Sequence, residues 1–144
     1  MTFPDDVFTA LRAEPGRVVI EHDGRKVTNT ELLAMVRSIA GGLRANGVRQ
    51  GVGVTVDTAV TPEAVATYLA CFALGATVGG DIVVTEARIH ELLASEEEPL
   101  LITTKPDHVA RYDDAGQPQT YEDLSDRLDG FLLCLLRGEV AVIT

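Results

Sequence analysis

The sequence lacks tryptophan, and aromatic residues of any kind make up only 5% of its 144 positions. A hydrophobic core must therefore be built mainly from Val, Leu, Ile and Ala, within an apolar fraction of 46%. That fraction and the length predict one folded domain, residues 1–144, rather than a disordered chain. The sequence contains no low-complexity segment and no internal repeat that would mark a second domain.

Long apolar runs and basic residues are also scarce. The longest unbroken apolar run, 131–136, is too short to cross a bilayer, and the N-terminus has neither the basic nor the apolar region of a signal peptide. Twelve basic residues against 22 acidic ones give a formal net charge of −10, which argues against nucleic acid and anionic membranes as partners. We expect a cytoplasmic protein whose acidic surface, on the simplest interpretation, keeps it in solution.

Reactive groups are few as well. The two cysteines, Cys71 and Cys134, each lie in an apolar run, where Cys behaves as a small buried hydrophobe and its thiol is inert. A disulfide is allowed by the count, but nothing else in the sequence indicates a secreted protein. There is no Walker loop, HExxH, CxxC or GxSxG, and His22, His90 and His108 lack metal-ligand spacing. We predict no metal and no cofactor.

What the sequence does contain is an alternation of helical and strand-like segments. Thr28, Thr61 and Thr85 each precede a helical apolar pattern as an N-cap, and Glu31 is placed to complete a capping box with Thr28. The helix after Thr61 is apolar over much of its surface, which predicts burial on more than one side. Asp23-Gly24 predicts a hairpin turn.

Short apolar strands are predicted near Val52, Ala76, Leu100 and Val140. Strands that alternate with helices indicate an α/β fold of three layers, with a mostly parallel sheet and helices on both faces. In such sheets, ligands bind beyond the carboxyl ends of the strands.

Polar residues follow three of these predicted strands, at 57–58, 79–81 and 103–104. Two carboxylates, Asp57 and Asp81, are expected to converge there. They are the first candidates for acid–base catalysis, because burial can raise the pKa of a carboxyl group toward neutrality. The alternative is that Asp, Thr and Gly are simply common where strands turn into helices.

Several short motifs occur in a fixed order: 27–32 (VTNTEL), 47–51 (GVRQG), 61–63 (TPE) with 68–70 (YLA), and 74–76 (LGA). The series resembles the opening of the adenylate-forming superfamily, which includes acyl-CoA synthetases, aryl-CoA ligases, luciferases and peptide-synthetase adenylation domains. The resemblance covers roughly residues 7–104 and implies the fold of the N-terminal subdomain of acyl-CoA synthetases. Asn29, Val52 and Gly80 depart from the usual Tyr, Asp and Pro of that family.

The last residues, 139–144, resemble the strand that leads into the family's phosphate loop. The resemblance implies that ATP is held by segments that would follow Thr144, among them a Ser/Thr/Gly-rich loop and a C-terminal domain with a Lys. Adenylation needs many preorganised donors on phosphate and carboxylate at once. We therefore expect a truncated relative without adenylating activity.

Three functions stay open at this point. The first is a stand-alone binding or interaction module in a biosynthetic pathway, with a small acyl ligand and either a homodimeric or a partner-enzyme contact. The residues expected to make that contact are Phe131, Leu132, Leu135 and Leu136. The second is a repurposed cyclase, lyase or hydrolase that acts on an acyl or polyketide-like intermediate through Asp57 and Asp81. The third is an expressed fragment of a full-length ligase.

Overall fold

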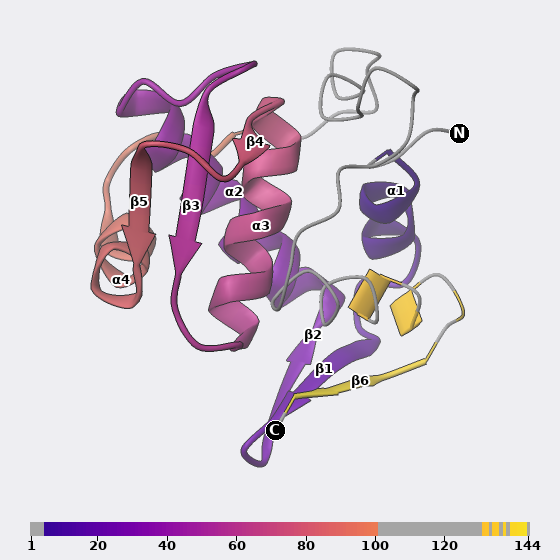
Figure 1. Ribbon diagram of the computed structural model, residues 1–144. Coiled ribbons are helices and arrows are strands. Elements are labelled where there is room, and N and C mark those ends of the chain that lie inside the picture. Colours follow the sequence, from indigo (N-terminus) through magenta and orange to yellow (C-terminus); the bar gives the residue numbers. More distant parts are fainter. Residues whose placement is uncertain (1–4, 101–130, 133, 136, 138, 144) are drawn as a thin grey trace.

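The computed structural model describes residues 5–100, 131–132, 134–135, 137 and 139–143. Figure 1 shows the arrangement of its helices and strands. In chain order these are α1 (Asp5–Ala13), β1 (Val18–His22), β2 (Arg25–Thr28), α2 (Asn29–Ala45), β3 (Gly53–Asp57), α3 (Pro62–Leu74), β4 (Thr77–Val78), β5 (Ile82–Thr85), α4 (Glu86–Ala94) and β6 (Ala141–Ile143). In the described part, no helix is long and apolar enough to cross a membrane.

The strands form two three-stranded sheets, in the orders β2-β1-β6 and β4-β3-β5. β1 and β2 make the predicted antiparallel hairpin, with positive φ at Asp23 and Gly24 in its turn. β6 pairs in parallel with β1, and β4 and β5 both run parallel to β3. The predicted α/β class with mainly parallel pairing is confirmed, but the strands divide between two sheets. Of the strand predicted from Leu100 onward, all but Leu100 lies outside the described residues.

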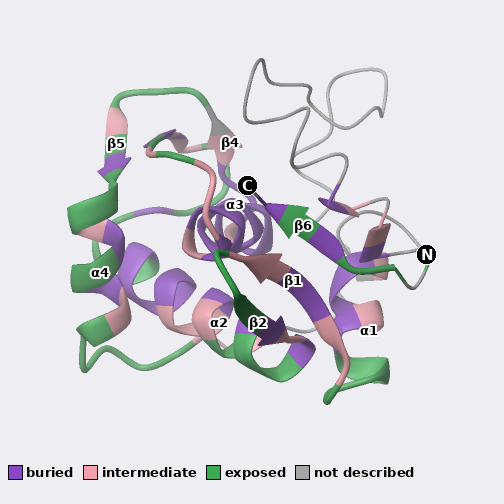
Figure 2. Cartoon of the chain, turned by 90° about the horizontal axis from the view of Figure 1, so that it is seen from below, coloured by how far each residue is buried: buried purple, intermediate pink, exposed green. Residues whose placement is uncertain are grey.

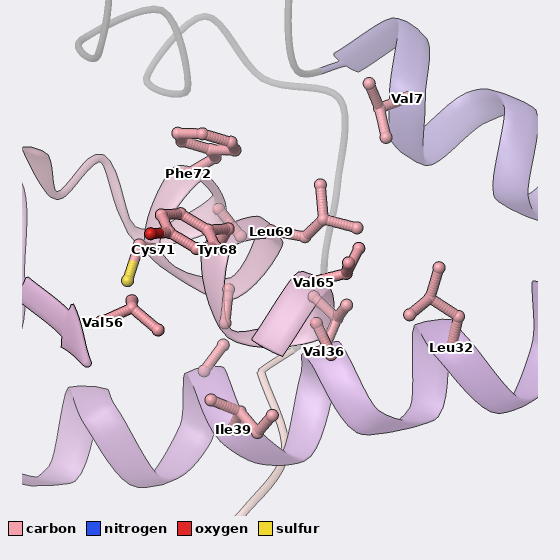
Figure 3. Packing of buried hydrophobic residues seen from close by; sticks show 14 of the residues in the cluster. Val7, Leu32, Val36, Ile39, Val56, Val65, Tyr68, Leu69, Cys71 and Phe72 are labelled. Atoms are coloured by element: carbon pink, nitrogen blue, oxygen red, sulfur yellow. The ribbon is translucent and has the colours of Figure 1, made fainter. Parts of the chain in front are cut away.

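Helix α3 is the centre of the hydrophobic core. Every residue from 64 to 73 is buried, and the helix lies between the two sheets in both overall views (Figures 1 and 2). α2 packs along it, with Val36 and Ile39 on the face toward Val65 (Figure 3). The predicted burial of this helix on more than one side is confirmed.

All three predicted N-caps are present. The hydroxyls of Thr28, Thr61 and Thr85 accept from the backbone N–H three residues further on, at 3.2, 3.1 and 3.3 Å. The capping box differs in one detail, because the Glu31 carboxylate accepts from the Thr28 hydroxyl at 3.1 Å, where a capping box uses the backbone N–H. Local sequence thus sets where α2, α3 and α4 begin.

The segment after α3 departs most from the sequence prediction. One short strand was expected at 76–78, but the chain forms both β4 and β5 with three residues between them. β4 ends level with Val54 of β3, and β5 begins level with the same residue on its other side. The chain therefore crosses β3 at Gly79 and Gly80. Gly53 makes room for the crossing, since a Cβ there would lie 2.9 Å from Gly79 O and Gly80 Cα.

Two side chains near β1 hold β6 in place. Arg17 Nη2 donates to the carbonyl of Glu139 at 2.8 Å, just before β6 begins. His22 Nδ1 donates to the carbonyl of Ile143 at 3.0 Å, at its other end. These contacts span more than 120 residues of sequence, and they add to the parallel pairing of β6 with β1.

The residues predicted to face a partner do not form one exposed surface. Phe131 and Leu135 expose only 3% and 2% of their surface and belong to the core of the chain itself. Leu132 is half-buried, and the side chain of Leu136 lies outside the described residues. The expectation is therefore wrong for Phe131 and Leu135, because their helical segment already packs on the core. A partner contact through Leu132 and Leu136 stays a prediction.

Candidate functional site

The carboxyl ends of β3 and β5 meet at one edge of their sheet. Asp57, the last residue of β3, pairs in register with Thr85, the last residue of β5. α3 and α4 follow these strands, and both helices begin with a capping threonine, Thr61 or Thr85. We call this place, formed by Asp57, Thr58 and Thr85, the β3–β5 edge. It is where a ligand is expected in a parallel sheet.

Asp81 lies at the opposite end of the sheet from Asp57. It directly precedes Ile82, which is level with Val54 near the start of β3, whereas Asp57 ends β3. Four residues of strand, at about 3.3 Å each, separate the two aspartates by about 13 Å along the strand axis. The predicted convergence of Asp57 and Asp81 is wrong, because β5, a strand that the sequence analysis missed, carries the chain from one end of the sheet to the other. A catalytic role for either aspartate alone stays a prediction.

Thr58 carries a hydrogen-bonding group with unused capacity. Its Oγ1 is buried and has no partner within the described part of the chain, while its neighbour Asp57 is exposed. A buried hydroxyl without a partner costs about 1–3 kcal/mol unless water or a ligand satisfies it. The sequence placed Thr58 beside a predicted strand end, but the burial of its hydroxyl depends on packing that no local pattern reveals.

An ion pair joins the β1–β2 hairpin to the first turn of α3. Arg25 Nη1 donates to Glu63 Oε1. Burial on its own would raise the pKa of Glu63. The hydrogen bond from Arg25, a backbone hydrogen bond at Glu63 and the nearby charges of Arg25 and His90 outweigh that effect and hold its pKa below the ordinary value. Sequence reasoning missed this pair, because 38 residues separate its members and no helical or strand spacing connects them.

The other reactive residues are engaged structurally or lie outside the described part. Cys71 is fully buried, and this burial raises the pKa of its thiol to about 12, as expected for a core residue. Both cysteines are free, and His22 bonds the backbone of β6. Thr103, Thr104 and His108 lie outside the described residues. Within the described ranges, no three His, Cys, Asp or Glu side chains gather as a metal site would require.

The β3–β5 edge therefore offers separate hydrogen-bonding groups rather than a paired acid and base. The cap hydroxyls of Thr61 and Thr85 each already accept from a backbone N–H of the helix that follows. The edge can orient a polar group near Asp57 and Thr58. The distance between Asp57 and Asp81 is too long for a direct proton transfer, since a catalytic acid or base must lie within hydrogen-bonding reach.

Comparison with known proteins adds to this geometry. A family model described as AMP-binding enzyme matches residues 7–125. No curated protein matches the chain.

Three solved structures that resemble the chain are each much longer than it. A double mutant of o-succinylbenzoate CoA synthetase from Bacillus subtilis, bound with the product analogue OSB-NCoA, aligns with a TM-score of 0.77 at 16% identity, over 98% of this chain and 44% of that one. The artificially fused adenylation–PCP di-domain NpsA-ThdA from Klebsiella oxytoca aligns with 0.73 at 17% identity, over 99% and 39%. The NpsA N-terminal subdomain from Klebsiella oxytoca, in complex with 3-hydroxyanthranilyl-AMSN, aligns with 0.75 at 16% identity, over 99% and 54%. At these identities the likeness concerns the fold, and the chain spans between 39% and 54% of their lengths.

Proposed function

We propose that residues 1–144, which belong to the family of AMP-binding enzymes, form a binding and interaction module. In this proposal the module does not adenylate a carboxylic acid by itself. Family membership and the shared fold confirm the resemblance seen in the sequence. In this proposal the module acts in the cytoplasm beside enzymes of a biosynthetic pathway, with a small acyl compound as its ligand.

The observation that carries the proposal is that the polar groups predicted to form one site do not converge, since Asp57 and Asp81 lie at opposite ends of β3 and β5. Adenylation requires several donors that act together on phosphate and carboxylate. The described polar groups are instead committed to structure. Thr61 and Thr85 cap helices, and Glu63 binds Arg25. Such an arrangement suits binding better than catalysis.

Exposed apolar residues support a contact with another chain at β6. Val142 exposes 66% of its surface and Val140 41%, whereas Ala141 and Ile143 are buried. Over the described ranges, β6 is the last strand of its sheet. An edge strand with exposed apolar side chains is a template for pairing with another strand. In our proposal a second copy of the chain pairs with β6, and a partner enzyme is the alternative occupant.

ATP–pyrophosphate exchange with a panel of aliphatic and aromatic carboxylic acids tests the catalytic part of the proposal. We expect the 144-residue polypeptide to show no exchange above the blank, while a complete acyl-CoA synthetase in the same assay shows exchange. Exchange that rises in proportion to the concentration of the polypeptide would overturn the proposal.

Sedimentation velocity tests the contact at β6. We expect a dimer that Val142→Glu converts to monomer, because the substitution places a charge on the proposed interface. Val83→Glu is the matched control, since Val83 is 53% exposed on β5 of the other sheet. A wild-type chain that stays monomeric at all accessible concentrations, or equal effects of the two variants, would contradict pairing through β6.

A repurposed small enzyme is the second candidate, favoured by the unpartnered hydroxyl of Thr58 next to the exposed Asp57. Here the chain would act on an acyl or polyketide-like intermediate at the β3–β5 edge, with Asp57 as acid or base. Turnover that survives in Asp57→Asn would reject this assignment. Asp81→Asn serves as the control, because Asp81 lies at the far end of the sheet.

The third candidate is that these residues act as part of a longer ligase, which the lengths of the similar structures motivate. The position of the stop codon in the gene tests it directly. A stop codon after Thr144 would reject this candidate and leave the first two.

A further inference from the structure

A groove of about 230 Å³ lies between α1 and α2, away from the β3–β5 edge. Its α1 side is formed by Leu11, Arg12 and Pro15, and its α2 side includes Leu33, Ala34 and Arg37. Leu11 is buried and Leu33 half-buried, whereas Arg12, Pro15 and Ala34 are exposed. The groove thus has an apolar floor and an accessible rim.

The α2 wall is a single stripe of one helix. Thr30, Leu33, Ala34 and Arg37 line it, with spacings of three and four residues that place side chains on the same helical face. The groove is open and smaller than the roughly 300–1,000 Å³ typical of enclosed small-molecule pockets. An open groove of this size can receive a few side chains from the ridge of another helix.

The charge of the groove is opposite to that of the protein. Its lining contains two arginines and no carboxylate, although the chain carries a net charge of −10. Arg37 is held at its base, because its Nε donates to Leu100 O at 3.1 Å and its carbonyl accepts from Leu100 N–H at 3.0 Å. A guanidinium group that is positioned in advance binds a carboxylate with less loss of side-chain freedom.

We propose that the groove between α1 and α2 docks an acidic amphipathic helix of a partner protein. Apolar side chains of that helix would lie on Leu11 and Leu33, and its carboxylates would face the positive charges of Arg12 and Arg37. Docking of an amphipathic helix through residues spaced i, i+3, i+4 and i+7 is a common mode of peptide recognition. The inference rests on the proposed role as a binding module, but it uses a different surface from β6.

Fluorescence anisotropy with two labelled 18-residue helical peptides tests the inference on the whole 144-residue polypeptide. Both peptides carry leucines at i, i+3, i+4 and i+7 and alanines elsewhere, apart from the same four flanking positions, which are glutamate in one peptide and lysine in the other. We expect the glutamate peptide to bind more tightly, although general attraction to a protein of net charge −10 favours the lysine peptide. Equal binding, or tighter binding of the lysine peptide, would overturn the inference.

Variants localise the binding. Arg12→Glu combined with Ala34→Glu should weaken the glutamate peptide at least about tenfold, because both side chains are exposed on the rim and the changes add like charges. Arg44→Glu, an exposed arginine of α2 that does not line the groove, should change it less than about twofold. Equal losses in both variants would show a general charge effect and contradict the groove.

Two other occupants are outcomes of the same experiment. Displacement of the glutamate peptide by octanoate alone would assign the groove to small carboxylic acids. Loss of self-association in the Arg12→Glu and Ala34→Glu variant would assign it to a second copy. Either result rejects the partner helix. The peptide experiment uses neither pyrophosphate exchange nor the Val142 variant, so its failure can be distinguished from failure of the proposed function.

Discussion

Gly80→Ala should destabilise the fold, because the added Cβ would clash with the backbone of β3. A Cβ at position 80 would lie 2.5 Å from Gly53 Cα, 2.6 Å from Gly53 C and 2.7 Å from Gly53 O. Carbon atoms pack best at about 3.5–4.0 Å, so β3 and the crossing segment would have to separate by about 1 Å. Neither side can yield by rotating a side chain, because both contacts are made by backbone.

The expected loss is about 2–3 kcal/mol. Overpacking of a well-packed site costs about 1–3 kcal/mol, and a clash between two backbones belongs at the upper end. The reduced freedom of the unfolded chain returns only about 0.4–1 kcal/mol. With roughly 2–4 °C per kcal/mol for a chain of this size, the melting temperature should fall by about 5–10 °C.

Urea unfolding followed by far-UV circular dichroism measures the effect. Gly16→Ala is the matched control, since a Cβ there would meet nothing within 4 Å, and it should be neutral or slightly stabilising. If Gly80→Ala and Gly16→Ala differed by less than about 0.5 kcal/mol, the chain would not cross β3 at Gly80, and the separation of Asp57 from Asp81 would lose its basis.

Three further predictions concern single residues. Glu63→Gln should destabilise the protein at neutral pH. Since the folded-state pKa of Glu63 is lowered, the stabilisation is lost as pH falls through that pKa, and the urea midpoints of wild type and variant should converge in acid. A difference that stays constant throughout the acid range would contradict the Arg25 pairing. Cys71, with its pKa near 12, should resist a thiol reagent in the native protein and react in urea, whereas half-buried Cys134 reacts first; equal native rates would refute its burial. Thr85→Ala should cost about 1 kcal/mol in urea unfolding through loss of the α4 cap, with Thr85→Ser as the control, and equal stability of the two variants would count against the cap.

Features set by a few neighbouring residues could be predicted from the sequence. The caps at Thr28, Thr61 and Thr85 depend on one hydroxyl and a backbone N–H three residues away, and the turn at Asp23-Gly24 depends on two residues that tolerate positive φ. For this reason the helix starts and the hairpin were located correctly, and with them the α/β class.

Strand pairing could not be predicted in the same way. β5 consists of four β-branched residues, the last of which is the Thr85 cap, but a run that short is ambiguous by itself. That β5 pairs with β3 rather than continuing β4 depends on the missing side chains of Gly53 and Gly80, where two backbone segments pass each other, and on the positive φ of Gly79 between them. The prediction of the candidate site was wrong for the same reason. Asp81 was expected to follow the strand near Ala76, but it directly precedes β5.

Two of the three departures from the family pattern, Gly80 and Asn29, have physical reasons in this chain. Gly80 stands where the family has Pro, and its N–H donates to Thr55 Oγ1 at 3.0 Å, a bond that proline cannot make. Asn29 stands where the family has Tyr, is fully buried, and donates through Nδ2 to Glu14 O at 2.8 Å. Each substitution replaces a bulky ring by a hydrogen bond to nearby chain, so neither is evidence of a degraded fold.

The bond made by Asn29 links the two proposed binding surfaces. Residues 14–17 connect α1 to β1, and Asn29 holds this turn through Glu14 O and, by its backbone N–H, through Arg17 O at 2.8 Å. Pro15 of the same turn lines the α1–α2 groove, and Arg17 donates to Glu139 at the start of β6. One turn therefore carries a lining residue of the groove and a contact to the segment just before β6. A substitution such as Asn29→Ala removes the bond that holds this turn and would disturb both surfaces at once, whereas Val142→Glu and the Arg12→Glu, Ala34→Glu pair each change one surface alone.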